Sequence, residues 1–140
     1  MTDVRIATLN LFNNAAGRWD DRAALVVEQA LALDADVYAF QECDLSEGQV
    51  ALVADALGAR YECVTLPNPS PRSIKSLAVI SRLPVVGHDG CVDLGSGDIA
   101  LRVRMGGGDR PIEVVTTHLH FGPSRRGSEI RAAQVRRLLS

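Results

Sequence analysis

An unbroken apolar run, Val37–Phe40, stops abruptly at the polar pair Gln41-Glu42. A short run of this kind is typical of a strand that is covered on both faces of its sheet. The segment Arg5–Leu11 predicts a second strand, which also turns polar near its end, at Asn10. Because such strands need layers on both sides, the sequence favours a layered α/β fold.

Two helices are predicted around the Val37–Phe40 strand. Asp20 is a suitable N-cap for the first helix. Apolar residues then recur at helical spacing, at Ala23, Val26, Val27, Ala30 and Leu33. Ser46 followed by Gln49 is a capping-box pattern for the second helix, and Gly58 is placed to end it. The order strand, helix, strand, helix supports the α/β assignment.

The second half of the chain is richer in strands. A stiff loop is expected at Pro67–Pro71, a hairpin turn at Gly106–Asp109 and a final helix from near Ser128. The predicted strands are Tyr61–Leu66, Leu77–Ser81, Cys91–Leu94, Ala100–Met105 and Ile112–Leu119.

The length of 140 residues predicts a single domain over residues 1–140. With 46% hydrophobic and 23% charged residues, the composition excludes a disordered tail, a collagen-like repeat and a coiled coil. Three cysteines without a CxxC pair argue against a disulfide framework. No basic segment precedes an apolar run at the N-terminus, and no stretch is long enough to span a membrane, so we expect a cytoplasmic protein.

The charge is divided unevenly along the chain, although the formal net charge is only -2. Residues 1–70 carry 4 basic and 11 acidic side chains, whereas residues 71–140 carry 11 basic and 6 acidic ones. Five arginines fall between Arg125 and Arg137. A solvated helix face accounts for most charge runs of this kind. The alternative is an anion-binding flank, because guanidinium forks fit phosphate oxygens.

Polar residues follow three of the predicted strands where each strand ends: Asn10, the pair Gln41-Glu42, and His118. In open α/β sheets, ligands bind beyond the carboxyl ends of the strands. An amide, a carboxylate and an imidazole together suit a hard metal and a phosphate, and Mg²⁺ accepts few protein ligands while it keeps several waters. Each residue also has a structural alternative: Asn10 as a turn former, Glu42 as a surface acid and His118 as a hydrogen-bonded histidine of the core.

A zinc site is a second chemical alternative. His118 and His120 lie on the same side of an extended strand, and such a His-x-His pair can ligate zinc. No third or fourth ligand follows at a recognisable spacing.

Four segments in series, RIATLNLFN, LDADVYAFQECD, SLAVISRLPV and VVTTHLHFG with RAAQVRRLL, resemble the endonuclease/exonuclease/phosphatase family of phosphoesterases. The resemblance covers nearly the whole chain. It implies a four-layer α/β sandwich of two mixed sheets with helices outside, of which this chain corresponds to about the first half.

The resemblance also implies a divalent-metal phosphoesterase, either a phosphodiesterase or nuclease or a phosphatase, that uses Mg²⁺ or Mn²⁺. Asn10 matches the asparagine that helps to place metal and phosphate, and Glu42 matches a metal ligand. Gln41 is then a hydrogen-bonding partner behind the metal ligand, and His118 matches a histidine that hydrogen-bonds either the scissile phosphate or an acidic neighbour. Candidate phosphate-binding arginines are Arg125, Arg126 and Arg131.

The sequence departs from the family in one respect. Family members continue with Gly-Asp-x-Asn and Ser-Asp-His motifs that act on the water, metal and phosphate, and neither motif is present. After His118 the only acid is Glu129. General-base catalysis needs a proton acceptor, so we expect the chain alone to be inactive or nearly so and to be part of a longer protein. The alternative is a noncatalytic binding or scaffold domain that keeps the fold.

The resemblance does not identify the substrate, because the family acts on nucleic acid, lipid and small-molecule phosphoesters with one core. The net charge of -2 argues against strong non-specific binding to duplex DNA, while the C-terminal arginines argue for anion binding. An incomplete sandwich exposes an apolar sheet face, so we expect the chain to self-associate through that face.

Overall fold

The computed structural model describes residues 3–12, 18–69, 75–106 and 110–140. Seven strands form two sheets in this part of the chain. The first sheet has the order β1-β2-β4-β3 and the second has the order β5-β6-β7. In chain order the elements are β1 (Ile6–Asn10), α2 (Trp19–Leu33), β2 (Val37–Cys43), α3 (Gln49–Leu57), β3 (Glu62–Leu66), β4 (Ser76–Ser81), β5 (Val85–Gly95), β6 (Asp98–Met105), β7 (Ile112–Thr117) and α4 (Arg125–Leu138).

The first sheet contains both parallel and antiparallel pairs of strands. A strand–helix–strand unit gives the parallel pair, and the strands that follow it add antiparallel pairs. β1 and β2 run parallel and in register from Ile6 opposite Val37 to Asn10 opposite Gln41. β4 pairs antiparallel with both β2 and β3. The second sheet is antiparallel throughout its described pairs. The predicted α/β layering is therefore confirmed, and the second sheet follows the strand-rich half of the sequence.

Alternation along β2 divides the apolar side chains between two cores. Val37 and Ala39 pack between the two sheets, against residues of β6 and β7. Tyr38 and Phe40 point the other way, into the core that α2 and α3 cover. Successive side chains of a strand point to opposite faces, so a continuous apolar run is what a strand inside two layers requires.

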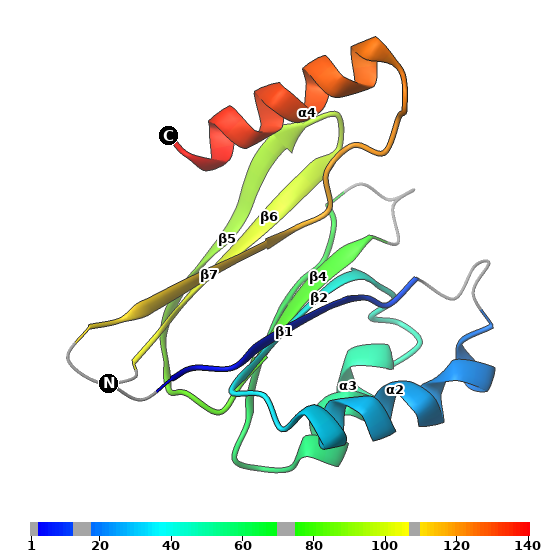
Figure 1. Cartoon of the computed structure of the whole chain (residues 1–140), viewed down its shortest axis with the longest axis vertical. Coiled ribbons are helices and arrows are strands. Elements are labelled where there is room, and N and C mark those ends of the chain that lie inside the picture. The colour runs from blue at the N-terminus through cyan, green and yellow to red at the C-terminus, as the bar shows by residue number, and fades with distance from the viewer. Residues whose placement is uncertain (1–2, 13–17, 70–74, 107–109) are drawn as a thin grey trace.

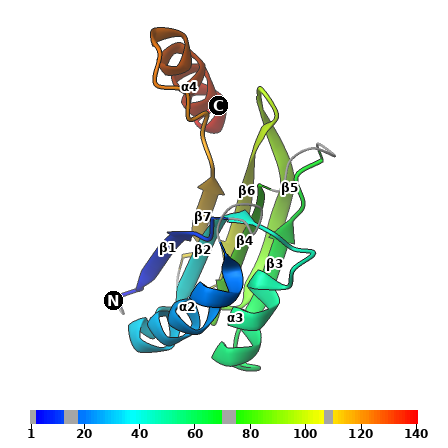
Figure 2. The same ribbon diagram turned by 90° about the vertical axis from the view of Figure 1, so that its right-hand side faces the viewer.

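The layers are visible in Figures 1 and 2, in which α2 and α3 cover one face of the first sheet and the second sheet lies behind its other face. β1, β2 and β7 all end on the side of the molecule where α4 lies (Figure 1). α4 itself contacts β5 beyond the ends of the strands. No helix among the described residues has the length and apolar character needed to cross a membrane.

The predicted N-cap of the first helix, Asp20, is wrong by two positions. α2 begins at Trp19, and its N-cap is Arg18 in the left-handed conformation, with φ 47°. Asp20 lies in the first turn instead, together with Asp21, whose carboxylate pairs with Arg18 at 2.6 Å. Carboxylates in a first turn stabilise the positive end of the helix dipole without acting as the cap.

The capping box predicted from Ser46 and Gln49 is also wrong. The N-cap of α3 is Gly48, and Gln49 is fully buried, with its Oε1 accepting a hydrogen bond from the Asp44 N–H at 2.8 Å. The glutamine therefore holds the preceding loop rather than the helix terminus. At the other end Gly58 is the C-cap, as predicted, and its N–H donates to the Ala54 carbonyl.

The last helix begins three residues earlier than near Ser128. Its N-cap is Ser124, whose side chain accepts a hydrogen bond from the Gly127 N–H. A Cβ on Gly127 would overlap the carbonyl oxygen of Gly122, so the first turn packs directly on the backbone of the preceding segment. Of the predicted hairpin turn Gly106–Asp109, residues 107–109 lie outside the described residues, as do residues 70–71 of the predicted loop.

Candidate functional site

The site begins with an irregularity in β2. Phe40 lies opposite Ala78 of β4, but Cys43 lies opposite Ser76, so β2 holds one extra residue between these two pairs. Glu42 occupies this bulge with φ 51°, in the left-handed region that costs a residue other than glycine about 1 kcal/mol or more. The apolar run of the predicted strand stops at Phe40, whereas β2 continues through Gln41 and Glu42 to Cys43.

The bulge changes the direction of the Glu42 side chain. Strict alternation would place residue 42 on the same face as Tyr38 and Phe40, toward the helices. The extra residue instead returns Cys43 to that core. Glu42 is directed toward β7, where its Oε1 lies 2.9 Å from Nε2 of His118. Bulges are known to redirect a side chain in this way beside active sites.

Glu42 and His118 form a largely buried polar pair. Their side chains are 12% and 21% exposed. The contact is an ion pair when the imidazole is protonated and a hydrogen bond when it is neutral. The other ring nitrogen, Nδ1 of His118, is buried and has no hydrogen-bond partner within the described ranges.

Asn10 and Gln41 lie beside this pair. Asn10 is opposite Gln41 in the parallel register of β1 and β2, and its Oδ1 accepts a hydrogen bond from the Phe12 N–H at 2.7 Å. Gln41 donates from Nε2 to the hydroxyls of Thr8 and Thr116. The structure thus brings Asn10, Gln41, Glu42 and His118 to one end of the two sheets.

The chain can also be assigned to a known family by its sequence. The sequence model of the Endonuclease/Exonuclease/phosphatase family matches residues 7–140. The chain belongs to this family. Among curated proteins, none matches the chain in sequence.

Solved structures share the family fold. Humanized D. rerio TDP2 with 14 mutations has a TM-score of 0.76 at 15% identity, over 97% of this chain and 58% of that chain. The human Nocturnin catalytic domain with bound sulfate has a TM-score of 0.76 at 22% identity, over 97% and 57%. ANGEL2, described as a 2′,3′-cyclic phosphatase, has a TM-score of 0.75 at 17% identity, over 97% and 46%. At these identities the likeness establishes the fold, and the chain spans less than two thirds of each of these structures.

The donor set of Asn10 and Glu42 suits the Mg²⁺ or Mn²⁺ that the sequence resemblance implies only if water completes the coordination. Glu42 offers one carboxylate, and Asn10 Oδ1 keeps a second lone pair beyond its bond to Phe12. Mg²⁺ is often held by one or two carboxylates and several waters, so these residues fit it. Across the described ranges, no three His, Cys, Asp or Glu side chains gather in a group that could hold an ion.

The same finding leaves the zinc alternative without support in the part of the chain that is described. His118 directs Nε2 at Glu42, and His120 lies beside Phe121 with its ring centroid 5.8 Å away. Tetrahedral zinc needs three or four His, Cys or carboxylate ligands, which these two histidines do not supply.

Cys43, next to Glu42 in the sequence, is not a nucleophile. It is fully buried, and burial raises the pKa of its thiol to about 12. The thiol is therefore protonated at neutral pH, and a protonated thiol is a poor nucleophile.

Two residues of α4 hold the segment that follows His118. Arg131 donates from Nη1 to the carbonyl oxygens of His120 and Gly122 at 3.1 and 2.7 Å. Gln134, which is 1% exposed, accepts from the His120 N–H at 3.0 Å and donates to Asp98 Oδ2 at 2.7 Å. Arg131 therefore clamps the backbone of this segment, and a phosphate contact for it stays a prediction.

The other two candidate arginines are on the surface of α4. The Arg125 side chain is 95% exposed and pairs with Glu129 at 3.3 Å, one turn along the helix. Arg126 is exposed as well. Both fit the solvated helix face that the charge run first suggested, and a phosphate contact for either stays a prediction.

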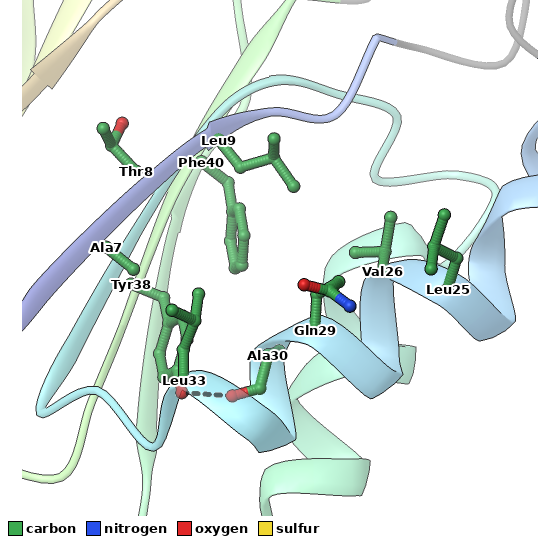
Figure 3. Close-up of a pocket in the computed structure, with 10 residues that line it drawn as sticks. All are labelled: Ala7, Thr8, Leu9, Leu25, Val26, Gln29, Ala30, Leu33, Tyr38 and Phe40. Carbon is green, nitrogen blue, oxygen red and sulfur yellow. Dashed lines mark hydrogen bonds between the residues drawn. The ribbon is translucent and has the colours of Figure 1, made fainter.

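An apolar pocket of about 370 Å³ lies on the helix side of the first sheet, between β1 and α2 (Figure 3). Leu9, Leu25 and Leu33 line it and are about half exposed. The hydroxyl of Tyr38 in its wall already donates to the Ala30 carbonyl at 2.6 Å. Because the pocket offers no pair of acid, base or metal-binding groups, it is not the candidate catalytic site.

Sequence reasoning missed Thr116 and Gln134 as parts of the site. Thr116 is 3% exposed and Gln134 is 1% exposed, and both are polar. A buried polar side chain has a partner that only the tertiary structure reveals. The sequence offered one signal: Gln134 lies in a predicted helix whose apolar residues are only loosely spaced along one face.

Proposed function

We propose that Asn10, Glu42 and His118 form part of the metal-dependent site of a phosphoester hydrolase. The observation that carries the proposal is the bulge, which turns Glu42 out of the helix-side alternation and places its carboxylate 2.9 Å from His118. Backbone strain of this kind persists where a site requires it. Membership of a family named for endonucleases, exonucleases and phosphatases supplies the class of reaction.

In this proposal the carboxylate of Glu42 and the amide oxygen of Asn10 hold Mg²⁺ or Mn²⁺. When bound, the cation polarises a phosphoryl oxygen and offsets the charge that develops as water attacks in line. Nε2 of His118 is bonded to Glu42 and Nδ1 is buried, so His118 would bind a phosphoryl oxygen through Nε2, after the Glu42 carboxylate turns to the cation. In that role His118 binds and orients the phosphate.

We propose further that this chain alone hydrolyses phosphoesters slowly or not at all. A general base must lie within hydrogen-bond reach of the attacking water. Glu42 is committed to His118 and the cation. Glu129, the only acid after His118, is on α4 and paired with Arg125. A further carboxylate is needed for full activity.

Two of the similar structures suggest which substrates to assay first. ANGEL2 is described as a 2′,3′-cyclic phosphatase, and D. rerio TDP2 is described in complex with a single-strand DNA product. We propose a phosphoester substrate for this chain. Cyclic phosphates and short single-stranded DNA are the first substrates to assay, with lipid and sugar phosphates as comparators.

We also propose a reducing, cytoplasmic location. Cys43 and Cys63 are both free thiols in the structure. Free cysteines are the usual state of proteins in the cytosol, where thiol systems keep them reduced.

The test is the affinity for Mn²⁺, measured by titration calorimetry on the wild type and on Glu42→Gln. The amide keeps the shape of the side chain but removes its charge, so binding should weaken at least tenfold. Glu47→Gln is the matched control, because Glu47 is an exposed glutamate in the loop that follows. Equal affinity of the wild type and Glu42→Gln would overturn the metal assignment. Rapid hydrolysis of an assayed phosphoester by this chain alone would overturn the proposal that a further carboxylate is needed.

A further inference from the structure

We infer that Gln41 is a positioning residue that ties the two sheets together at the site through Thr8 and Thr116. The effect of Gln41 on catalysis rests on the proposed function, whereas its hydrogen bonds do not depend on that proposal. One amide connects three strands: β1 through Thr8, β2 through Gln41 itself and β7 through Thr116.

The position of Gln41 follows from the alternation along β2. Val37 and Ala39 point into the core between the sheets. Gln41 is the next residue in the same row, and it comes just before the bulge at Glu42. The apolar interface between the sheets therefore ends in an amide, next to the carboxylate of the site.

The hydrogen bonds of the amide define its orientation. Nε2 lies 2.8 Å from Thr116 Oγ1, 3.0 Å from Thr8 Oγ1 and 3.1 Å from the Ala39 carbonyl. A carbonyl oxygen can only accept, so the nitrogen and not the oxygen of Gln41 must face this group. The two amide hydrogens are shared among the three acceptors.

The spacing along each strand connects this tie to the site. Thr8 is two residues before Asn10 and Thr116 is two residues before His118, while Gln41 directly precedes Glu42. Residues two apart on a strand lie on the same face. The Gln41 amide thus binds a threonine two residues before Asn10 and another two residues before His118, and Gln41 itself directly precedes Glu42.

The tie matters most between β2 and β7, because these strands belong to different sheets and share no backbone ladder. The distance from Glu42 to His118 therefore depends on side chains. Thr116 is 3% exposed, so loss of its partner leaves a buried hydroxyl unsatisfied. A displacement of about 1 Å in such a constellation can reduce a reaction rate a hundredfold.

The experiment compares three variants of neighbouring threonines in the full chain. Thr116→Val removes the hydroxyl that Gln41 binds, and Thr116→Ser keeps it. Thr117→Val is the matched control, because the hydroxyl of Thr117, on the same strand, donates to the Ile99 carbonyl at 2.9 Å instead of binding Gln41. The first readout, without metal, is the set of nuclear Overhauser contacts between the His118 ring and the Glu42 side chain. The second is Mn²⁺ affinity.

We expect Thr116→Val to weaken the contacts between His118 and Glu42 and to reduce Mn²⁺ affinity about tenfold, as is usual when a partner behind a metal ligand is lost. Thr116→Ser should restore both, and Thr117→Val should change neither. Unchanged contacts in Thr116→Val would overturn the inference. If Thr116→Val does not fold, Gln41→Met removes the same bond from the other side and is judged by the same readouts.

The contacts between His118 and Glu42 are measured without metal or substrate, so the two proposals fail separately. If Glu42→Gln leaves Mn²⁺ affinity unchanged, the proposed function fails. The positioning role of Gln41 still stands if Thr116→Val alone disturbs the contacts of His118.

Discussion

Glu42 Oε1 lies 2.9 Å from His118 Nε2, although Glu42 is in β2 of the first sheet and His118 directly follows β7 of the second. One extra residue in β2 makes the contact, because it turns the Glu42 side chain from the helix layer toward β7. A family resemblance predicts which residues belong to the site, whereas the bulge explains how the carboxylate reaches the imidazole.

The left-handed backbone at Glu42 predicts an unusual order of stabilities. Both Glu42→Ala and Glu42→Gly lose the carboxylate, but glycine accepts φ 51° without strain. We expect the glycine variant to be more stable than the alanine variant by about 1 kcal/mol in urea unfolding. In α3 the order should reverse, with Asp55→Gly about 1 kcal/mol less stable than Asp55→Ala. If the alanine variant is more stable than the glycine variant at both positions, the backbone at Glu42 is not strained.

The contacts of Gln134 predict that α4 stabilises the segment after His118. Gln134→Leu leaves the His120 N–H and Asp98 without their partner, so we expect the free energy of unfolding to fall by about 1–3 kcal/mol. The His120 amide should also exchange its hydrogen faster in the variant. Arg126→Ala, an exposed change on the same helix, should stay within about 0.5 kcal/mol of the wild type. An unchanged exchange rate at His120 would contradict the clamp.

Asp36 predicts part of the acid sensitivity of the fold. The Arg5 N–H and the Arg82 guanidinium, both bound at 2.7 Å, hold the pKa of this carboxyl below its ordinary value of 3.8. A lowered folded-state pKa contributes stability above the pKa of the unfolded chain, and that contribution is lost as the pH falls through the folded-state pKa. Asp36→Asn should therefore be less stable than the wild type at pH 7, with the difference shrinking well below pH 3.8.

Urea unfolding at a series of pH values measures this difference. Asp55→Asn, on the exposed face of α3, is the control and should follow the wild type across the series. If the gap between wild type and Asp36→Asn stays constant as the solution is acidified, the carboxylate makes no contribution of this kind.

The apolar pocket beside β1 predicts self-association. β1 is the outer strand of the first sheet, and Leu9 and Leu33 at the pocket are 44% and 49% exposed. Sedimentation velocity over a concentration series should show association that Leu9→Asp and Leu33→Asp reduce. Leu52→Asp is the control, because Leu52 is 44% exposed but does not line this pocket. A monomer at every concentration would refute the expectation.

Much of the fold could be predicted from local patterns. The apolar run of β2 and the helical spacing in α2 each arise from one element and its neighbouring layer, so the sequence of that element is sufficient to indicate it. Asn10, Glu42 and His118 share one end of the molecule because strand ends of a layered fold gather there.

The features that could not be predicted depend on pairs of elements. The bulge at Glu42 exists only relative to the register of β4. Gln49 has a capping-box spacing, but the Asp44 N–H competes for the same side chain. Arg131 has the chemistry of a phosphate ligand, yet its Nη1 donates to two backbone carbonyls of the preceding segment. In each case the partner is distant in sequence or chosen by the tertiary structure.

The extra residue in β2 also sets a condition for design. A scaffold that carried the same amino acids on a regular strand would direct the carboxylate into the apolar layer beneath the helices. Grafting this centre onto another sheet therefore requires transplanting an insertion as well as side chains. A template chosen by residue identity alone would reproduce the motif and lose the geometry.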